Sequence, residues 1–462
     1  MKFQKIISLN PSKNYEVIGE VDPSTYPEVD AKIINARKAQ PAWSRLTVAE
    51  RITFLEKCSQ VFIARKNDIR SIMAQEMGMP ISICDRIDID PGLRYMQGYL
   101  DFAEKWLAPE ITYETKEEIH MLFFEPRGVA GISVPWNYPF SLFIWGVMQN
   151  LIVGNTVVFK HSEECPLTGK LLEEIMQSAG LPDGVFNAVY GTGSEIGEYL
   201  MKNSIDLIWF TGSTGVGKHL NQIAAEKLIP AILELGGSAA GIVFEDADIK
   251  MTIESIYFNR FMNSGQTCDG LKRLIVHRTI FDEIVQGLKD LIMTKKVGPA
   301  EDPSTDIGPL VAERQVINLE RQVDDALQKG ARLIIGGKRP PHLKGAYYEP
   351  TVLTHIKQDM AVWKEEVFGP VLPIVFFDTD DEAIRLANDS QYGLGGYIYT
   401  QNKERALEVS RYLQTGNISI NAANYVIPQD PFGGYKNSGL GREHGKQGLR
   451  ELCSLKLVAL KK

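Results

Sequence analysis

The sequence lacks any segment rich in lysine and arginine, and its 58 acidic residues outnumber its 50 basic ones. Nucleic acids and anionic membrane surfaces attract clustered positive charge, so neither is an expected partner. Long apolar segments are also missing, because the longest, Tyr138 to Met148, is too short to span a bilayer. Met1 to Asn14 lacks the apolar core and the cleavage site of a secretory signal. We therefore expect a cytoplasmic protein that acts on a small molecule.

Cysteine is scarce, and the few cysteines are scattered along the chain. They form no CxxC pair and no cluster with histidine; they are Cys58, Cys84, Cys165, Cys268 and Cys453. This pattern favours a reducing compartment and indicates no zinc site, so no metal is expected. Four of the cysteines are interpreted as small buried hydrophobic residues, because none of them lies in a glycine-bearing turn. His161 and His219 are expected at the surface.

Cys268 differs from the other cysteines, because it ends the small-residue stretch Asn263 to Cys268, which contains Gly265. A glycine-bearing turn lets backbone N–H groups approach a reacting atom, and a cysteine there can attack a carbonyl. Glu234 lies between an apolar run and a Gly-Gly pair, where a carboxylate is costly to bury without a task. The sequence therefore predicts a nucleophile at Cys268 and a general base at Glu234.

Two segments are predicted from periodicity before the main α/β region. Residues 45 to 77 have helical spacing, with Thr47 and Glu50 in the positions of a capping box, and Gly78 ends the helix. Residues 108 to 126 alternate around a charge cluster and indicate a projecting strand arm. The tail from Leu452 to Leu460 alternates again, and its strand edge would stay unpaired on a monomer.

Short β-rich runs alternate with amphipathic helices from residue 157 onward, in a 462-residue chain long enough for two or three domains. The expected strands and helices of the first series are strands 157–160, 186–190 and 205–211 and helices 167–179 and 216–228. A second series has expected strands at 271–276, 333–335, 372–376 and 418–421. Repeated strand-helix-strand units predict doubly wound parallel sheets with ligands at the carboxyl ends of the strands.

The stretch Phe210 to His219, FTGSTGVGKH, follows an expected strand and opens an expected helix. Backbone N–H groups at such a helix start can bind a pyrophosphate. The stretch also nearly matches the P-loop GxxxxGK[ST], but His219 stands where a hydroxyl must contact Mg²⁺. A P-loop nucleotide hydrolase is thus a weaker alternative, and a plain strand-helix connection stays open. Gly191 to Gly197 is one residue too long for GxGxxG and is interpreted as a turn.

Several motifs occur together in one order along the chain. They are PWNYP at 135–139, KHSE at 160–163, FTGSTGVG at 210–217, ELGG at 234–237, GQTC at 265–268, EEVFGP at 365–370 and PFGGYK at 431–436. With this combination the chain resembles the aldehyde dehydrogenase superfamily over nearly its whole length, and its size and GGYKNSG context resemble bacterial semialdehyde dehydrogenases. The resemblance implies NAD(P)-dependent oxidation of an aldehyde to a carboxylate.

The resemblance also implies roles for individual residues. Cys268 would form a thiohemiacetal and then a thioester, and Asn137 with the Cys268 backbone N–H would hold the oxyanion. Glu234 would activate the water that hydrolyses the thioester. Without Cys268 nearby, Asn137 would be interpreted as an ordinary loop residue. A CoA-acylating relative has no need of a base, so Glu234 favours hydrolysis.

Cofactor contacts are implied in the same way. Lys160 and Glu163 match the residues that bind the adenosine ribose, and Glu366 and Phe368 match those at the nicotinamide ribose and ring. A carboxylate at position 163 would repel a 2′-phosphate, so NAD is expected, with NADP as the alternative. The other expected cofactor-binding residues are Pro135, Trp136, Gly212, Ser213, Leu235 and Gly236.

The fold implied by the resemblance is α/β, with a Rossmann-like cofactor domain, an α/β catalytic domain and a small β oligomerisation domain. The expected bounds are 1–107 and 127–237 for the NAD-binding domain, 238–440 for the catalytic domain, and 108–126 with 441–462 for the oligomerisation domain. The arm and the tail are expected to pair across subunits of a homodimer or homotetramer.

The sequence is compatible with two classes of aldehyde substrate. Tyr138, Trp145 and Phe432 are expected along a substrate funnel and suit an apolar aldehyde, whereas the motif contexts suit a semialdehyde such as succinate semialdehyde. Asp269, directly after the nucleophile, would raise the pKa of the thiol and repel an acidic substrate, unless its side chain points elsewhere.

Overall fold

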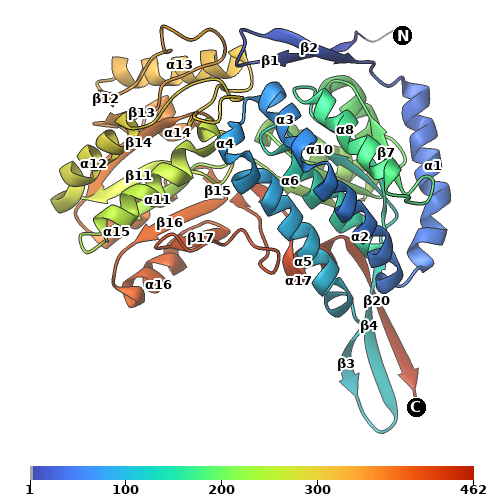
Figure 1. Ribbon diagram of the computed structural model, residues 1–462. Coiled ribbons are helices and arrows are strands. Elements are labelled where there is room, and N and C mark those ends of the chain that lie inside the picture. Colours follow the sequence, from blue (N-terminus) through green and yellow to red (C-terminus); the bar gives the residue numbers. More distant parts are fainter. Residues whose placement is uncertain (1–3) are drawn as a thin grey trace.

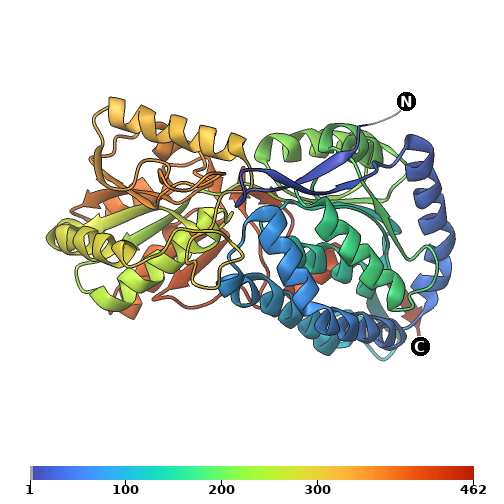
Figure 2. The ribbon, with the colours of Figure 1, turned by 45° about the horizontal axis from the view of Figure 1, so that its top comes forward.

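The computed structural model describes residues 4–462 as two α/β lobes and a smaller sheet that projects from them (Figure 1). Turned about the horizontal axis, the molecule shows the two lobes lying side by side (Figure 2). Residues 1–3 of the expected cofactor domain lie outside the described residues. No helix within residues 4–462 has both the length and the apolar composition needed to cross a membrane.

The first lobe contains a six-stranded sheet with the strand order β19-β9-β8-β5-β6-β7. Its strands are β5 (Val129–Ser133), β6 (Thr156–Lys160), β7 (Phe186–Val189), β8 (Leu207–Thr211), β9 (Ala231–Glu234) and β19 (Gly439–Leu440). All neighbours are parallel except β19, which pairs antiparallel with β9. The chain order reverses between β5 and β8, which is where doubly wound sheets open a ligand crevice.

Helices surround this sheet, and a hairpin of β1 (Ile6–Asn10) and β2 (Glu16–Val21) lies over one end. The helices of this lobe are α1 (Tyr26–Arg45), α2 (Val48–Ala64), α3 (Lys66–Met77), α4 (Ile81–Cys84), α5 (Asp90–Trp106), α6 (Pro139–Phe143), α7 (Gln149–Val153), α8 (Pro166–Ser178), α9 (Glu198–Lys202) and α10 (Thr214–Lys227). Single π-helical turns also occur at Asp85–Ile89, Ile144–Met148 and Gly193–Gly197.

The helix expected over residues 45–77 is in fact two helices. Thr47 and Glu50 form the predicted capping box at the start of α2, and Gly78 ends α3 in the left-handed conformation. Between them Arg65 leaves the helical conformation, with φ −98° and ψ 13°. Neither glycine nor proline marks that break, so the periodicity alone could not reveal it.

The second lobe contains a seven-stranded sheet with the order β12-β13-β14-β11-β10-β16-β17, and β12 is its antiparallel edge. Its strands are β10 (Ala239–Val243), β11 (Leu271–His277), β12 (Arg332–Ile335), β13 (Thr351–Thr354), β14 (Val371–Phe377), β16 (Gly395–Tyr399) and β17 (Asn417–Ile420). Its helices are α11 (Ile249–Phe261), α12 (Phe281–Met293), α13 (Glu313–Gln328), α14 (Ala361–Lys364), α15 (Asp380–Asn388) and α16 (Lys403–Tyr412). Helix α17 (Gly445–Glu451) packs on the first lobe, against α5.

Two short 3₁₀ turns, Met262–Gly265 and Arg278–Ile280, flank β11, and β15 (Tyr392–Gly393) pairs with β18 (Tyr435–Lys436). All the strands and helices expected from residue 157 onward occur within a few residues of their predicted bounds, because each buried strand is a short apolar run. The strand β19 lies inside the expected catalytic segment but belongs to the first sheet.

The arm is a hairpin of β3 (Glu110–Glu114) and β4 (Glu118–Pro126), and it projects from the first lobe as predicted (Figure 1). The tail strand β20 (Cys453–Lys461) pairs antiparallel with β4 along its whole length, in the same chain. The expectation that arm and tail pair across subunits is therefore wrong, since the cis pairing already satisfies that edge of β4. The outer edge of β20 remains without a partner strand in the described sheet.

The observed burial contradicts the expectation for one histidine and confirms the expectation for four cysteines. His161 lies buried against Phe159, contrary to the expectation that it is at the surface, whereas His219 is exposed. Burial lowers the pKa of His161 to about 4, so this side chain is neutral. The four other cysteines are buried free thiols, and Cys268 is partly exposed.

Candidate active site

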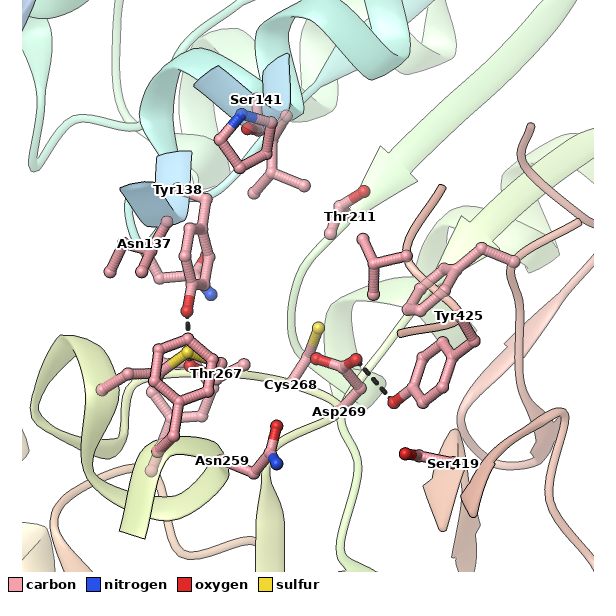
Figure 3. A pocket seen from close by; sticks show the side chains of 18 of the residues that line it. Asn137, Tyr138, Ser141, Thr211, Asn259, Thr267, Cys268, Asp269, Ser419 and Tyr425 are labelled. Atoms are coloured by element: carbon pink, nitrogen blue, oxygen red, sulfur yellow. Dashed lines mark hydrogen bonds between the residues drawn. The ribbon is translucent and has the colours of Figure 1, made fainter. Parts of the chain in front are cut away.

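A cavity of about 880 Å³ lies where the two lobes meet, and both lobes contribute to its lining. Most of the residues expected in the site face it: Pro135, Trp136, Asn137, Tyr138, Trp145, Gly212, Ser213, Leu235, Gly236, Cys268, Glu366, Phe368 and Phe432. Glu234, Lys160 and Glu163 are absent from its lining in the described structure. Figure 3 shows Cys268 at the centre, below the Asn137 and Tyr138 segment.

The first-lobe residues reach the cavity because they follow the carboxyl ends of neighbouring parallel strands. Pro135, Trp136 and Asn137 follow β5, Gly212 and Ser213 follow β8, and Leu235 and Gly236 follow β9. These ends meet at one edge of the sheet, on both sides of the reversal in strand order. The sheet topology thus gathers segments that are far apart in the sequence.

The Cys268 turn, residues 263–268, is held in an unusual backbone conformation. Asn263, Ser264 and Gly265 all have positive φ values, of 48°, 53° and 75°, and two of these residues are not glycine. A Cβ at Gly265 would come within 2.3 Å of the Gly369 backbone oxygen, so only glycine fits there. Strained residues of this kind persist where the surroundings hold them, and they cluster at functional sites.

Hydrogen bonds fasten this turn to the Asn137 segment. The Asn263 amide donates to the backbone oxygen of Asn137 at 2.7 Å, and the Asn137 amide donates to that of Gln266 at 3.0 Å. The Gln266 side chain accepts from the backbone N–H of Val311 at 2.9 Å. One N–H of the Asn137 amide is thus used to orient the side chain, and the other is left for the cavity.

Burial strongly raises the pKa of the Cys268 thiol, and the charge of Asp269 raises it further. Lys272 acts in the opposite direction, because its ammonium favours the thiolate. The Lys272 side chain is 0% exposed and donates to the backbone oxygens of Gly237 at 2.7 Å and Cys268 at 3.0 Å. Lys272 was not predicted as a site residue from the sequence. Its position, four residues after Cys268, was the one feature of the sequence that could have indicated it.

Lys272 also connects the Cys268 turn to Glu366, with which it forms an ion pair. The Glu366 carboxylate accepts from the backbone N–H of Gly237 at 3.0 Å. Beside it, the Phe368 ring meets Trp136 edge to face, with ring centroids 5.5 Å apart. Glu366 and Phe368 therefore lie where the ELGG turn, the Cys268 turn and the PWN segment converge.

Glu234 ends β9 and is buried, and neither of its carboxylate oxygens has a hydrogen-bond partner in the described structure. Burial is the largest cause that raises the pKa of Glu234, and the neighbouring Glu443 carboxylate is the next. A Cβ on Gly433 would lie 2.9 Å from Glu234 Oε1, so the side chain points toward Gly433 and away from the cavity lining. Glu443, also buried, was not foreseen from the sequence.

Lys160 and Glu163 lie together at the end of β6, outside the cavity lining. Lys160 Nζ is 3.0 Å from Glu163 Oε2, and the Gly193 backbone N–H donates to Glu163 Oε1 at 3.2 Å. The Lys160 side chain is buried, whereas the Glu163 side chain is 38% exposed. An accessible carboxylate on a buried lysine is suited to accept hydrogen bonds from ribose hydroxyls.

The first turn of α10 has room for a negatively charged group. Its N-cap residue Ser213 makes no side-chain cap, so the first backbone N–H groups have no such partner. Nothing lies within 4 Å of a Cβ built on Gly215. Because α10 already begins at Thr214, Lys218 lies inside the helix, and the stretch does not form the loop that a P-loop hydrolase requires.

Asp269 lines the cavity, so its side chain does not point elsewhere, which was the alternative left open by the sequence. Its Oδ2 accepts from the Tyr425 hydroxyl at 2.8 Å, and its backbone oxygen accepts from the Tyr397 hydroxyl at 2.9 Å. Figure 3 places the carboxylate next to the Cys268 thiol, with Tyr425 on its other side. Neither tyrosine was identified from the sequence, because nothing local marks them.

The expected funnel residues form an aromatic wall. Trp145 and Phe432 have ring centroids 6.0 Å apart, and Tyr425 stacks on Phe432 at 6.5 Å. The Tyr138 hydroxyl is 2.7 Å from Thr267 Oγ1, so this ring is held next to the residue that precedes Cys268. The wall can bury an apolar chain next to Cys268.

Comparisons with known proteins agree with this geometry. The succinate-semialdehyde dehydrogenase of Arabidopsis thaliana mitochondria is 36% identical over 458 residues, which cover 99% of this chain and 86% of the relative. A probable succinate-semialdehyde dehydrogenase [NADP(+)] of Sinorhizobium fredii is 34% identical, with coverages of 99% and 93%. A Mycobacterium tuberculosis aldehyde dehydrogenase, solved with NAD⁺, superposes with a TM-score of 0.94 at 35% identity, covering 98% of this chain and 94% of that one.

The model of the aldehyde dehydrogenase family matches residues 2–458, nearly the whole chain. The cavity between the lobes and the cysteine in a strained turn are the features that such an enzyme needs for covalent chemistry on a carbonyl. The chain therefore belongs to the aldehyde dehydrogenase family.

Proposed function

We propose that Cys268 is the nucleophile of an NAD-dependent oxidation of a small aldehyde to its carboxylate. Family membership supplies the reaction class, which is oxidation of an aldehyde by an NAD(P)-dependent oxidoreductase. The observation that supports Cys268 is its position in a strained turn at the cavity, whereas the other cysteines are buried. Its pKa is raised, so a base or the bound substrate complex has to favour the thiolate.

In the first step the thiolate sulfur forms a bond to the carbonyl carbon, and the carbonyl oxygen becomes an oxyanion. The free N–H of the Asn137 amide and the Cys268 backbone N–H are the donors that we assign to this oxygen. The Gln266 contact fixes the Asn137 amide, so it need not reorganise when the negative charge develops. The adduct, a thiohemiacetal, must then lose two electrons and a proton to become a thioester.

NAD supplies the hydride acceptor for that oxidation when it is bound. Glu366 and Phe368 would hold its nicotinamide ribose and ring, Lys160 and Glu163 its adenosine ribose, and Pro135, Trp136, Gly212, Ser213, Leu235 and Gly236 would line its path. The open first turn of α10 and the exposed carboxylate of Glu163 fit such a dinucleotide. Glu163 favours NAD over NADP, because a carboxylate repels the 2′-phosphate.

Hydrolysis of the thioester requires a water molecule and a group that accepts its proton, and we assign this group to Glu234. Its pKa is raised above the usual carboxyl range, which makes it a stronger base than an exposed glutamate. Since both of its oxygens lack partners, no hydrogen bond holds it away from the cavity. It directly precedes Leu235 and Gly236, which line the cavity, so a side-chain rotation would bring it to the thioester.

The substrate is a small aldehyde, and two classes of aldehyde are candidates. The aromatic wall of Tyr138, Trp145 and Phe432 supports an apolar aldehyde. The similarity to the Arabidopsis succinate-semialdehyde dehydrogenase supports a semialdehyde. A CoA-acylating reaction would deliver the thioester to a thiol and would leave Glu234 without a task.

We further propose that the chain is a cytoplasmic homodimer or homotetramer with the three domains expected from the sequence. The projecting sheet supports an assembly role, because β20 exposes Leu455 and Leu457 to 64% and 61% next to a free strand edge. Replacing both leucines with lysine should give a smaller species by light scattering. An unchanged oligomer would assign the interface elsewhere.

The experiment that tests the reaction is NADH formation with a panel of apolar, aromatic and carboxylated aldehydes, together with identification of the product. The expected product is the free acid without added CoA. Cys268→Ala should abolish turnover and leave NAD affinity nearly intact, since the thiol serves chemistry and not cofactor binding. Turnover by the alanine variant, or a requirement for CoA, would contradict the proposed mechanism.

A further inference from the structure

The carboxylate of Asp269 lies in the lining of the cavity, next to the Cys268 thiol. Cys268 and Asp269 are consecutive residues and both line the cavity. The Tyr425 hydroxyl engages Oδ2 at 2.8 Å, and the Tyr397 hydroxyl fixes the backbone of Asp269 at 2.9 Å. A carboxylate held in this way has a defined direction and a second oxygen with unused acceptor capacity.

Lys272, the cation that follows Asp269 in the sequence, is not available to a substrate. Lys272 is fully buried, and its three hydrogen bonds go to Gly237, Cys268 and Glu366. Two arginines also line the cavity, Arg86 and Arg94, but both are exposed at its rim. Arg86 lies over the Phe258 ring, 4.5 Å from its centroid, and the exposed Glu254 carboxylate shares this rim. Close to the thiol, the Asp269 carboxylate is therefore the charge that faces the cavity.

We propose that Asp269, oriented by Tyr425, recognises a hydrogen-bond donor on the substrate, and that the preferred substrate is a hydroxyaldehyde whose hydroxyl lies next to the carbonyl. This inference rests on the proposed oxidation at Cys268 and adds the substrate class. It assigns Asp269 a role in specificity, and it assigns Tyr425 a positioning role.

Two physical effects select the same substrate. When a substrate fills the cavity, the Asp269 carboxylate loses water molecules that hydrogen-bond to it. A substrate hydroxyl can donate a hydrogen bond in their place, whereas an apolar aldehyde leaves the carboxylate oxygen without a partner. A carboxylated aldehyde brings a second negative charge into a cavity of low dielectric constant, where like charges repel strongly. The aromatic wall, which Tyr425 joins to Asp269, is compatible with a short carbon chain. Acidic semialdehydes should therefore be poor substrates, although relatives that act on them are similar in sequence.

Matched substrate pairs test the recognition. The compared quantity is kcat/KM for NADH formation with lactaldehyde against propanal, and with succinate semialdehyde against butanal. We expect wild type to favour lactaldehyde over propanal by about tenfold or more, equivalent to about 1.4 kcal/mol. We expect it to disfavour succinate semialdehyde against butanal by a similar factor. Equal values within both pairs, or a preference for succinate semialdehyde, would overturn the proposal.

The variant Asp269→Ala should remove both preferences, so that each ratio moves toward one. Because changing Asp269 also alters the thiol pKa, only ratios between substrates are compared, and the common effect on the thiolate cancels. Glu254→Gln is the matched control, since it removes a cavity carboxylate at the rim and should leave both ratios unchanged. If the two kcat/KM ratios change as much in Glu254→Gln as in Asp269→Ala, the assignment of specificity to Asp269 is overturned.

A second variant keeps the test decisive if Asp269→Ala fails to fold. Tyr425→Phe leaves the charge of Asp269 in place but removes the bond that orients it. We expect this variant to lose most of the preference for lactaldehyde and to retain the discrimination against succinate semialdehyde. Loss of neither preference would refute the positioning role. Failure of the proposed reaction is recognised separately, because it would appear as turnover in the Cys268→Ala variant.

Discussion

Gly237 and Cys268 lie so close together that a Cβ built on Gly237 would come within 2.3 Å of the backbone oxygen of Cys268. The ELGG turn and the Cys268 turn are thus packed backbone against backbone, and Lys272 donates hydrogen bonds to the backbone oxygens of both. Any side chain at position 237 would clash with the Cys268 backbone, so one of the two turns would have to move. This contact explains in physical terms why glycine follows the Glu234 segment.

Gly237→Ala should therefore lower kcat/KM strongly and destabilise the fold by about 1–3 kcal/mol, the usual cost of overpacking. Gly215→Ala is the control for stability, because nothing lies within 4 Å of its Cβ, and alanine suits the first turn of a helix. Thermal unfolding of both apoproteins provides the measurement. A Gly237 variant that unfolds and turns over like wild type would contradict the contact.

Glu234→Gln should separate the two halves of the reaction. The variant keeps the size of the side chain but cannot accept a proton, so the thioester should form once and then stall. A burst of NADH approaching one equivalent per site should be followed by a steady rate about 10²-fold lower, the usual scale for a lost general base. Mass spectrometry should find the acyl group on the Cys268 peptide. Without a burst, Glu234 would be needed earlier, to deprotonate the thiol.

Glu163→Ser should shift cofactor preference toward NADP. Glu163 is held by Lys160 and by the Gly193 N–H, and removing its charge should improve kcat/KM for NADP relative to NAD by about tenfold, or about 1.4 kcal/mol. Glu164→Gln is the control, because that carboxylate pairs with Arg314 and should not affect the ratio. A wild-type enzyme that already prefers NADP would refute the role of Glu163.

The reactivity of Cys268 should depend on pH in a direction set by its two charged neighbours. Its pKa is raised by burial and by Asp269, so alkylation of the apoenzyme by iodoacetamide should increase as the pH rises above neutral. Asp269→Asn removes a charge that raises the pKa, so the alkylation profile should move to lower pH. Lys272→Met removes a charge that lowers the pKa, so the profile should move to higher pH. Shifts in the same direction for both variants would contradict this electrostatic account.

The α/β organisation could be predicted from the sequence because it depends on local patterns. Apolar runs such as Val157 to Lys160 are periodic and short, and a capping box such as Thr47 with Glu50 occupies adjacent turns of one helix. The turn before Cys268 could be predicted for the same reason, since its small residues are consecutive. The break at Arg65 escaped prediction because no local residue marks it.

The sequence by itself determined the strand-helix order, the projecting arm and the candidate residues Cys268, Asn137 and Glu234. Only the tertiary structure decided that β20 pairs with β4 in the same chain, and that Glu234 points toward Gly433. It also decided the direction of Asp269, whose partner Tyr425 is 156 positions away. The physical reason is that side chains in loops follow no period. Their directions are set by residues that only the completed fold brings into contact.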